Sequence, residues 1–435
     1  MKTGFASLSA ALLLMLAAAV PPADGAGRIT AWTDGTWFDG TAFRRVDVYS
    51  VGDRLTLKRP RTVDATVDLA GRYVTGAFGE AHNHNIPGGD TDATIRTYLK
   101  QGIFYVMIQA NVPEAPRELA GRVNAPGTVE VAFANGLFTA PGGHPTALVE
   151  RNINNGGMTD ADRHGGFLHP VATRADIDRE WDTRIRPQHP DFIKIVLTYS
   201  EDRVAGIPRP AGSDRHGLDP ALAAHIVKRA HRDGLRVSAH VESAYDFDVA
   251  IDAGADVIAH MPGFWPDDAR IAAKGTALYK ISEASARRAA RRRVPVVTTV
   301  GESLRNIADG GKRAALRQPL LDVYRHNFSV LARHGVRIVI GSDQFRSTSV
   351  PEAIDIRKAG LLTPAAALRA LTIDAAATIF PRRAPFGLAE GAPADFVVLD
   401  ANPLEDFSAI ERVGMRVKGG RELQPGIEGP PKTQP

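Results

Sequence analysis

Five short strings of the sequence combine residue types that bind divalent metals, and each lies at or near the carboxyl end of an apolar run. They are His82-Asn83-His84, Lys194, His240, His260 and Asp343. Neutral imidazoles and carboxylates are ligands that Zn²⁺ and similar cations accept. In an α/β barrel the carboxyl ends of different strands converge on one mouth, where that fold places its chemistry. The order and the strand context of the five strings therefore predict one metal site.

Each string alone is a weaker signal than the set. His82 and His84 would share one face of a strand, but a lone His-x-His pair is more often part of a loop. Taken singly, His240 and His260 are better explained as hydrogen-bonded core histidines. Asp343 ends an apolar run, and a carboxylate buried there needs a partner or a metal. The prediction of a metal site depends on all five occurring together.

Lys194 is the least expected member of the set. It interrupts the apolar run 191–197, although lysine is rarely buried without a reason. One explanation is that its aliphatic stem runs along the strand and carries the ammonium group to the mouth of the fold. The other is that desolvation lowers the pKa of the amine and makes a neutral nitrogen available for chemistry. The histidines and the aspartate at neighbouring strand ends favour the second explanation.

The segments that must position these residues alternate between strand-like and helix-like patterns. This alternation is typical of a parallel βα architecture, and eight strands suffice to close a (β/α)₈ TIM-type barrel. Residues 137–190 are too long for a plain connection, and we expect them to form loops over the mouth. The expected strands are 73–82, 102–109, 128–135, 191–198, 236–241, 256–260, 294–300 and 337–342, and the clearest helices are Pro220–Asp233, Gln318–His334 and Thr363–Ile379.

Both ends of the chain contain short β-rich segments with turn residues between them. Residues 28–75 contain four such segments, and residues 395–417 contain two more. We therefore predict an α/β protein in which a small β-sandwich domain, built from 26–75 and 384–425, flanks a barrel of residues 76–383. The last residues, 426–435, are expected to be disordered.

Composition and the N-terminus bear on the cellular context. The 435 residues include 44% hydrophobic and 23% charged residues, which is typical of a soluble globular protein. A basic start, an apolar stretch at 5–20 and small residues at Ala23 and Gly25 predict a signal peptide at 1–25, and hence a periplasmic or secreted protein. A membrane anchor is the alternative, but spanning helices need about 20 apolar residues. The absence of cysteine agrees with export.

The run Arg287–Arg293 contains five arginines and is the strongest local concentration of charge. It directly precedes the apolar strand expected at 294–300, and no aromatic residues are interleaved with the arginines. We therefore expect the solvated face of a helix there and no nucleic-acid partner. After signal cleavage no membrane association is expected; the expected partner is a small-molecule substrate, and a homo-oligomer is compatible with the sequence.

The motifs together resemble the binuclear subtype of the amidohydrolase superfamily, over nearly the whole mature chain. The resemblance rests on the His-x-His after the first strand, the lysine in the fourth, single histidines ending the fifth and sixth, and Gly341-Ser342-Asp343 after the eighth. The segments 66–74 and 391–399 also resemble the family's passage into the barrel and its return to the β-domain. Within the superfamily, the chain is most similar to imidazolonepropionase-like and Xaa-Pro or Xaa-Arg dipeptidase-like members. Residues 76–81 depart from the family's usual Pro-Gly before the first histidine.

The resemblance implies a binuclear metal-dependent hydrolase that cleaves a C–N bond, for example in a dipeptide or an N-acyl amino acid. His82 and His84 would bind a buried metal ion, and His240 and His260 a more exposed one, with Zn²⁺ as the expected metal. Lys194, carboxylated by CO₂, would bridge the two ions. Asp343 would complete the buried site and act as the general acid–base for a metal-bridging hydroxide.

Contacts to the substrate are less well defined by the sequence. The candidates are Tyr199, His144, Arg203 and Trp265, the last beside Phe264, and an ordinary loop role explains each of them equally well.

Three other functions remain open. Lactone or ester hydrolysis uses the same two-metal apparatus. Deamination of a heterocycle is less favoured, because those enzymes place a glutamate three residues after the fifth-strand histidine, whereas Glu242 follows His240 by two. A non-catalytic metal- or solute-binding protein would have no need of a proton shuttle at Asp343.

Overall fold

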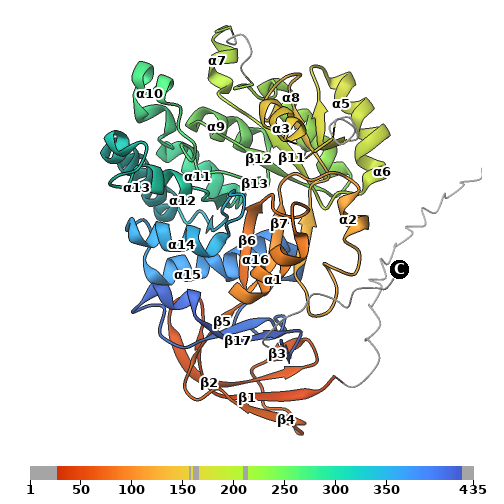
Figure 1. Ribbon diagram of the computed structural model, residues 1–435, viewed down its shortest axis with the longest axis vertical. Coiled ribbons are helices and arrows are strands. Elements are labelled where there is room, and N and C mark those ends of the chain that lie inside the picture. The colour runs from red at the N-terminus through yellow and green to blue at the C-terminus, as the bar shows by residue number, and fades with distance from the viewer. Residues whose placement is uncertain (1–26, 156–157, 160–165, 209–213, 424–435) are drawn as a thin grey trace, which may run out of the picture.

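The computed structural model describes residues 27–155, 158–159, 166–208 and 214–423 (Figure 1). The expected signal peptide and the expected C-terminal tail lie outside these residues. The described chain has a β-rich part, at the bottom of Figure 1, and an α/β part above it. No helix among the described residues is long and apolar enough to cross a membrane.

The β-rich part is one hydrogen-bonded sheet that contains strands from both ends of the chain. The C-terminal strand β16 pairs antiparallel with β5, with Val398 opposite Val74. Indole rings of Trp32 and Trp37 lie 5.0 and 4.9 Å from the ring of Phe396 and fill the core of this part. The described strands are, in spatial order, β18 (Arg421–Glu422), β17 (Val413–Lys418), β16 (Phe396–Leu399), β5 (Tyr73–Gly76), β1 (Ile29–Phe38), β2 (Phe43–Val51) and β3 (Arg54–Thr56), with β4 (Ala65–Asp68) beside β1.

The α/β part contains parallel strands in two described sheets. Nearly every residue of these strands is buried, as expected for strands covered by helices on their outer faces. The larger sheet has the order β10 (Leu168–Pro170), β9 (Leu137–Thr139), β11 (Phe192–Val196), β12 (Arg236–His240), β13 (Val257–Ile258), β14 (Val296–Val297) and β15 (Ile338–Val339), and the smaller has the order β6 (Phe78–Asn83), β7 (Ile103–Ile108) and β8 (Glu130–Phe133).

Backbone hydrogen bonds connect the edges of these two sheets. The N–H of Asp191, just before β11, donates to the carbonyl of Phe133 at the end of β8 (2.9 Å). On the other side, the N–H of Ala81 in β6 donates to the carbonyl of Ile340 after β15 (3.2 Å). The strand that carries His82 therefore lies beside the strand that leads to Asp343.

Helices follow the parallel strands and cover them from outside (Figure 1). α8 begins as its sequence predicts, because Asp219 accepts a hydrogen bond from the Ala221 N–H and Pro220 occupies the first turn. The described helices of four or more residues are α1 (Thr91–Gln101), α2 (Ala115–Glu118), α3 (Thr146–Asn154), α5 (Arg174–Glu180), α7 (Ser200–Val204), α8 (Pro220–Arg232), α9 (Ala244–Ala253), α10 (Asp268–Lys274), α11 (Glu283–Arg292), α12 (Gly301–Asn306), α13 (Arg317–Arg333), α14 (Ser349–Lys358), α15 (Pro364–Leu371) and α16 (Ile373–Ile379).

The structure differs from the sequence-based expectation in three places. The strand expected at 73–82 is two strands of different sheets, interrupted at Ala77. The helix expected at Thr363–Ile379 is two helices, because Thr372 adopts φ −107° and ψ −87° between them. Residues 137–190, expected to carry loops over the mouth, also contain β9, β10 and several helices, and β9 pairs with β11 through Phe138 and Ile195.

Candidate metal centre

The six predicted metal-site residues lie on, or just beyond, the carboxyl halves of parallel strands. His82 lies in β6, with His84 just beyond its end, and His240 is the last residue of β12. Lys194 lies within β11, and its register partner in β12 is Ser238. His260 and Asp343 follow β13 and β15, respectively, after short loops. Because the strands are parallel, all six residues are brought towards the same end of the strands.

His82, His84 and Asp343 form the tightest group. Oδ1 of Asp343 lies 3.4 Å from Nε2 of His82 and 3.2 Å from Nε2 of His84. The potential ligand atoms of the three residues all lie within 4.8 Å of one another. They are held in place by the main chain, because the N–H of Asp343 donates to the carbonyl of His82 at 2.8 Å.

Glu80 anchors the segment that carries Asp343. Its two carboxylate oxygens accept hydrogen bonds from the N–H (2.8 Å) and the Oγ (2.9 Å) of Ser342. The Glu80 side chain is fully buried, and burial raises its pKa to about 8. Since Glu80 and His82 share β6, this contact fixes the position of Asp343 relative to the histidine pair.

The proton positions on His82 show that these atoms suit a cation. Nδ1 of His82 lies 2.8 Å from the carbonyl oxygen of Ala259, which can only accept, so Nδ1 carries the hydrogen. Burial lowers the pKa of His82 well below its usual value, so the ring is neutral and its Nε2 offers a lone pair. That lone pair faces an oxygen of Asp343. Two acceptors facing each other in a buried site are stabilised by a cation between them.

The carboxylate of Asp343 is in the form that such a cation requires. Burial alone would raise its pKa, but the surrounding histidines and Lys194 hold the pKa below its usual value. Its side chain is 23% exposed, whereas those of His82 and His260 are 1% exposed. Asp343 is therefore ionised and accessible from the mouth of the fold.

His240 and His260 extend the group on the side of β12 and β13. The ring centroid of His260 lies 4.3 Å from that of His82 and 4.4 Å from that of His240. Nδ1 of His260 contacts Oγ1 of Thr299 (3.0 Å) and lies 3.7 Å from Oδ2 of Asp343. Burial lowers the pKa of His240 to about 3 and that of His260 well below its usual value. Both imidazoles are therefore neutral, which is the form that binds metals.

Lys194 is buried beside this group and hydrogen bonded to a residue that the sequence did not single out. It is 3% exposed, and its Nζ donates to Oε1 of Gln109 at 3.1 Å. Burial lowers the pKa of the amine to about 7, so a large fraction is neutral near pH 7. Gln109 directly follows β7 and closes an apolar strand with a polar residue. Like His240, Gln109 lies at the end of an apolar run, but glutamine is not among the usual ligand types of Zn²⁺.

Glu242 is a second residue whose place in the site emerges only from the structure. Its Oε1 lies 3.2 Å from Nε2 of His240, and its Oε2 has no hydrogen-bond partner among the described residues. Burial raises the pKa of Glu242 to about 8. The sequence signal was its position two residues after a candidate ligand.

The predicted substrate contacts fall into two groups. The ring of His144 lies 5.0 Å from that of His240, so His144 borders the metal-site histidines. Tyr199 is buried, and its hydroxyl lies 3.2 Å from that of Tyr279. Arg203 instead pairs with Asp219 at 3.0 Å.

Aromatic side chains lie around the histidines. Phe264 stacks on His260 with a centroid distance of 3.8 Å, whereas the adjacent Trp265 is exposed. Phe345, not singled out from the sequence, is exposed and lies 6.4 Å from the ring of His84. An apolar wall therefore borders part of the site.

The fold and the site together define an α/β protein in which buried neutral imidazoles, a carboxylate and a lysine converge at one end of parallel strands. A sequence profile of the amidohydrolase family matches residues 170–423, and the chain belongs to that family. This confirms the resemblance drawn from the motifs and the prediction of an enzyme. Members of the family typically bind metal ions, in agreement with the His82, His84 and Asp343 group.

Solved structures share the fold at low sequence identity. Ochratoxinase of A. niger is 18% identical, with a TM-score of 0.70 over 93% of this chain and 98% of that one. A prolidase complexed with N-methylphosphonate-L-proline is 19% identical, with a TM-score of 0.66 over 91% and 99%. A Xaa-Pro dipeptidase with bound methionine is 18% identical, with a TM-score of 0.67 over 91% and 100%. No curated protein sequence matches the chain.

Proposed function

We propose that this protein is a binuclear metal-dependent hydrolase that cleaves a C–N bond of an amide, such as that of a dipeptide or an N-acyl amino acid. The proposal rests on two acceptor atoms that lie close together in the site. Nε2 of the neutral His82 ring and an oxygen of the ionised Asp343 carboxylate are 3.4 Å apart. Relatives of similar fold include a prolidase and a Xaa-Pro dipeptidase, which supports an amide substrate.

The donor set divides naturally between two cations. His82, His84 and Asp343 would hold the first, because their ligand atoms form the tightest group. His240 and His260 would hold the second, since their neutral rings adjoin that group. Two divalent cations, with Zn²⁺ the expected ion, would lower the pKa of a water molecule and polarise a substrate carbonyl.

Lys194 would bridge the two positions as a carbamate. Formation of a carbamate requires a neutral amine, which attacks the carbon of CO₂ and releases one proton. The lowered pKa of Lys194, about 7, supports this step. The hydrogen bond to Gln109 would hold the nitrogen in place, and the carboxylate of the carbamate would be the bridging ligand.

Asp343 would move the proton in the reaction. As an ionised carboxylate at the mouth, it accepts a proton from the attacking water and passes it to the leaving nitrogen, a general acid–base role. His144 and Phe264 border His240 and His260, and we assign them to the wall that contacts the substrate.

We also propose that the parallel strands close into a barrel and that the protein is exported. The hydrogen bonds between β8 and β11 and between β6 and the segment after β15 support closure of the strands into a (β/α)₈ barrel, residues 76–383. The sheet shared by both ends would form the accessory domain, 26–75 and 384–425. Export follows from the apolar N-terminus. N-terminal sequencing of protein from the periplasm and the medium tests it.

Metal analysis of the purified protein, together with a panel of dipeptides, N-acyl amino acids and lactones, tests the reaction. We expect two metal ions per chain and turnover of amides. One ion with release of ammonia would replace the proposal with deamination. Turnover of lactones alone would replace it with ester hydrolysis, and a metal-loaded protein inert on the whole panel would point to a binding protein.

A further inference from the structure

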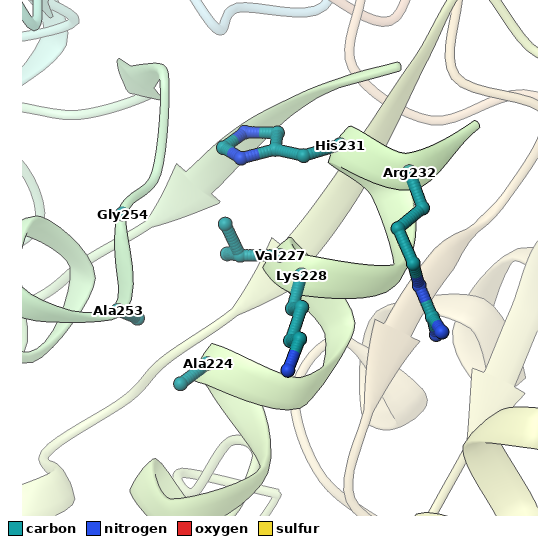
Figure 2. A pocket seen from close by; sticks show the side chains of 7 residues that line it. All are labelled: Ala224, Val227, Lys228, His231, Arg232, Ala253 and Gly254. Carbon is teal, nitrogen blue, oxygen red and sulfur yellow. The ribbon is translucent and has the colours of Figure 1, made fainter. Parts of the chain in front are cut away.

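Two surface hollows lie next to each other at the amino ends of the parallel strands. One, of about 440 Å³, lies between α8 and α9 and includes Lys228, His231 and Arg232 in its lining (Figure 2). The other, of about 380 Å³, lies below β12 to β15. Gly254, at the end of α9, lines both. The two hollows therefore adjoin at Gly254 and are together named the depression.

The lining of the second hollow is strongly basic. It contains Arg236, Arg292, Arg293 and Arg337, and one carboxylate, Asp256. That carboxylate already has two partners, the N–H of Val237 (2.7 Å) and Nε2 of His231 (2.9 Å). Arg337 is paired with Asp374 at 3.4 Å, so the excess positive charge of the hollow comes mainly from Arg292 and Arg293.

Arg236 forms the inner wall of this hollow. Its guanidinium donates to the carbonyls of Thr378 (2.7 Å) and Ile379 (2.9 Å), which close the last turn of α16. Carbonyl partners hold the group in a fixed orientation but carry no net charge. Arg236 therefore contributes a positioned cation, which also interacts electrostatically with Asp256 and Asp191.

Arg292 and Arg293 stand at the rim, at the end of α11. Both are exposed, and neither forms an ion pair with a residue that the structure describes. Arg288 of the same helix differs, because it pairs with Asp248 (2.6 Å) and Asp252 (3.2 Å). Within the arginine run, Arg288 is therefore neutralised, whereas Arg292 and Arg293 at its end line the hollow.

This depression is separate from the metal centre. Arg236 opens β12 and His240 closes it, so the two sites lie about 13 Å apart along one strand, at a rise of about 3.3 Å per residue. A ligand held at the amino end leaves the carboxyl end free.

We propose that the two hollows form one binding site for a phosphate-bearing polyanion. Guanidinium groups bind phosphate oxygens through paired, charge-assisted hydrogen bonds, and Arg292 and Arg293 have donors free for them. Lys228 and Arg232 extend the positive surface along α8 to receive further phosphates. The phosphates belong either to a soluble oligophosphate or to the headgroups of an anionic membrane. The proposal does not depend on the reaction assigned to the metal centre.

The test uses the full chain and two double variants that remove the same charge from the same helix. Arg292→Gln/Arg293→Asn removes the rim cations, and asparagine suits the left-handed backbone at position 293, where φ is 56°. Arg287→Gln/Arg291→Gln removes two arginines that do not line either hollow. Binding of tripolyphosphate is measured by calorimetry. Co-sedimentation with phosphatidylglycerol-containing vesicles, against phosphatidylcholine alone, distinguishes the two sources.

We expect the rim variant to weaken binding by about tenfold or more, since charge-assisted hydrogen bonds are lost, while the control variant binds like the parent. Loss of tripolyphosphate binding identifies a soluble ligand, and loss of vesicle binding alone identifies a lipid headgroup. Equal weakening in both variants would show diffuse attraction to a basic surface and overturn the proposal. Absence of binding to both probes by the parent would also overturn it.

Discussion

Lys194 and Gln109 are joined by a hydrogen bond of 3.1 Å from Nζ to Oε1, and both side chains are buried. Oγ of Ser238 donates to the same oxygen at 2.9 Å. Lys194 and Ser238 are register partners on β11 and β12, so their side chains point to the same side and reach the same acceptor. The amide of Gln109 in turn donates to the carbonyl of Ala81 at 3.1 Å. One glutamine therefore connects three strands around the lysine.

Replacement of Gln109 by leucine should show how far the stability of the fold depends on this shared acceptor. Leucine has a similar size but no acceptor, so Lys194 and Ser238 would each keep a buried donor without its partner. We expect a loss of about 1–3 kcal/mol in the free energy of unfolding for each such group, measured by urea denaturation. Gln318→Leu is the control, since Gln318 bonds to Asp322 on the surface. Equal stability of the two variants would contradict this role.

Lys194→Ala should show whether Lys194 is a metal ligand or only a buried lysine. If the carbamate bridges two cations, the variant retains fewer than two metal ions per chain, as measured by mass spectrometry of the metals. Acetate, which supplies a carboxylate to the vacated space, should restore part of the metal content and of the turnover. Lys280→Ala, at an exposed lysine, should change neither. Full metal content in Lys194→Ala without acetate would exclude the bridge.

Asp343→Asn should distinguish the role of Asp343 in proton transfer from its role in metal binding. Asparagine keeps a ligand oxygen but cannot shuttle a proton, so we expect the metal content to persist while kcat falls by about 10²–10⁴-fold. Metal analysis and steady-state rates on one preparation check this. Asp322→Asn serves as the exposed control. A variant that keeps its metals and its turnover would remove Asp343 from the proton pathway.

Glu352 predicts a pH dependence of stability away from the metal centre. It accepts hydrogen bonds from the N–H groups of Val300 and Gly301, both at 2.7 Å, and burial raises its pKa to about 8 from a usual 4.5. The folded protein then binds this proton more tightly than the unfolded chain does. Stability from this group is present below about pH 4.5 and is lost as the pH rises to about 8.

Glu352→Gln removes this titration. Between pH 5 and 8, the unfolding free energy of the variant should fall less steeply than that of the parent, by up to about 1.4 kcal/mol per pH unit. Urea denaturation at fixed metal content measures the slope. Parallel pH profiles for the two proteins would show that Glu352 does not titrate in this range.

Lys418 predicts how firmly the β-rich part is attached. Its Nζ contacts Glu130 at 2.6 Å and Asp395 at 3.2 Å, and its side chain is 6% exposed. Lys418→Met would leave Asp395 without its cation, whereas Glu130 would keep Arg383, and we expect a loss of about 3 kcal/mol in unfolding free energy. Lys312→Met, at an exposed lysine, is the control for calorimetric and urea measurements. A similar small effect in both would show that the pair is not structural.

The residues proposed as metal ligands could be selected from the sequence because metal binding restricts ligands to few residue types, here at strand ends. His240 and Asp343 stand out in apolar runs, whereas Gln109 does not, because a glutamine at a strand end is compatible with many roles. Glu242 was visible, but its contact with His240 depends on how the chain turns after β12. Side-chain partners of this kind are set by tertiary packing and leave no local pattern.

Among the strands and helices, too, features with a local sequence signal were predictable and features set by tertiary packing were not. Long periodic segments such as Pro220–Arg232 were predicted to within a residue, because capping and amphipathic spacing are local signals. β9 and β10 were missed, because strands of three residues are too short to show a periodicity. The division between β5 and β6 was missed because one continuous apolar run serves two sheets.

That division also bears on the order in which the protein can assemble. β5 leads, through Ala77, directly into the strand that carries His82, and its neighbour on one side is β16, residues Phe396–Leu399. A chain made from the amino end reaches β16 only after nine-tenths of its length has been synthesised. β5, which leads into the strand that carries His82, therefore acquires this neighbour only when nearly the whole chain has been synthesised, so the β-rich part beside the proposed metal centre is completed late in assembly.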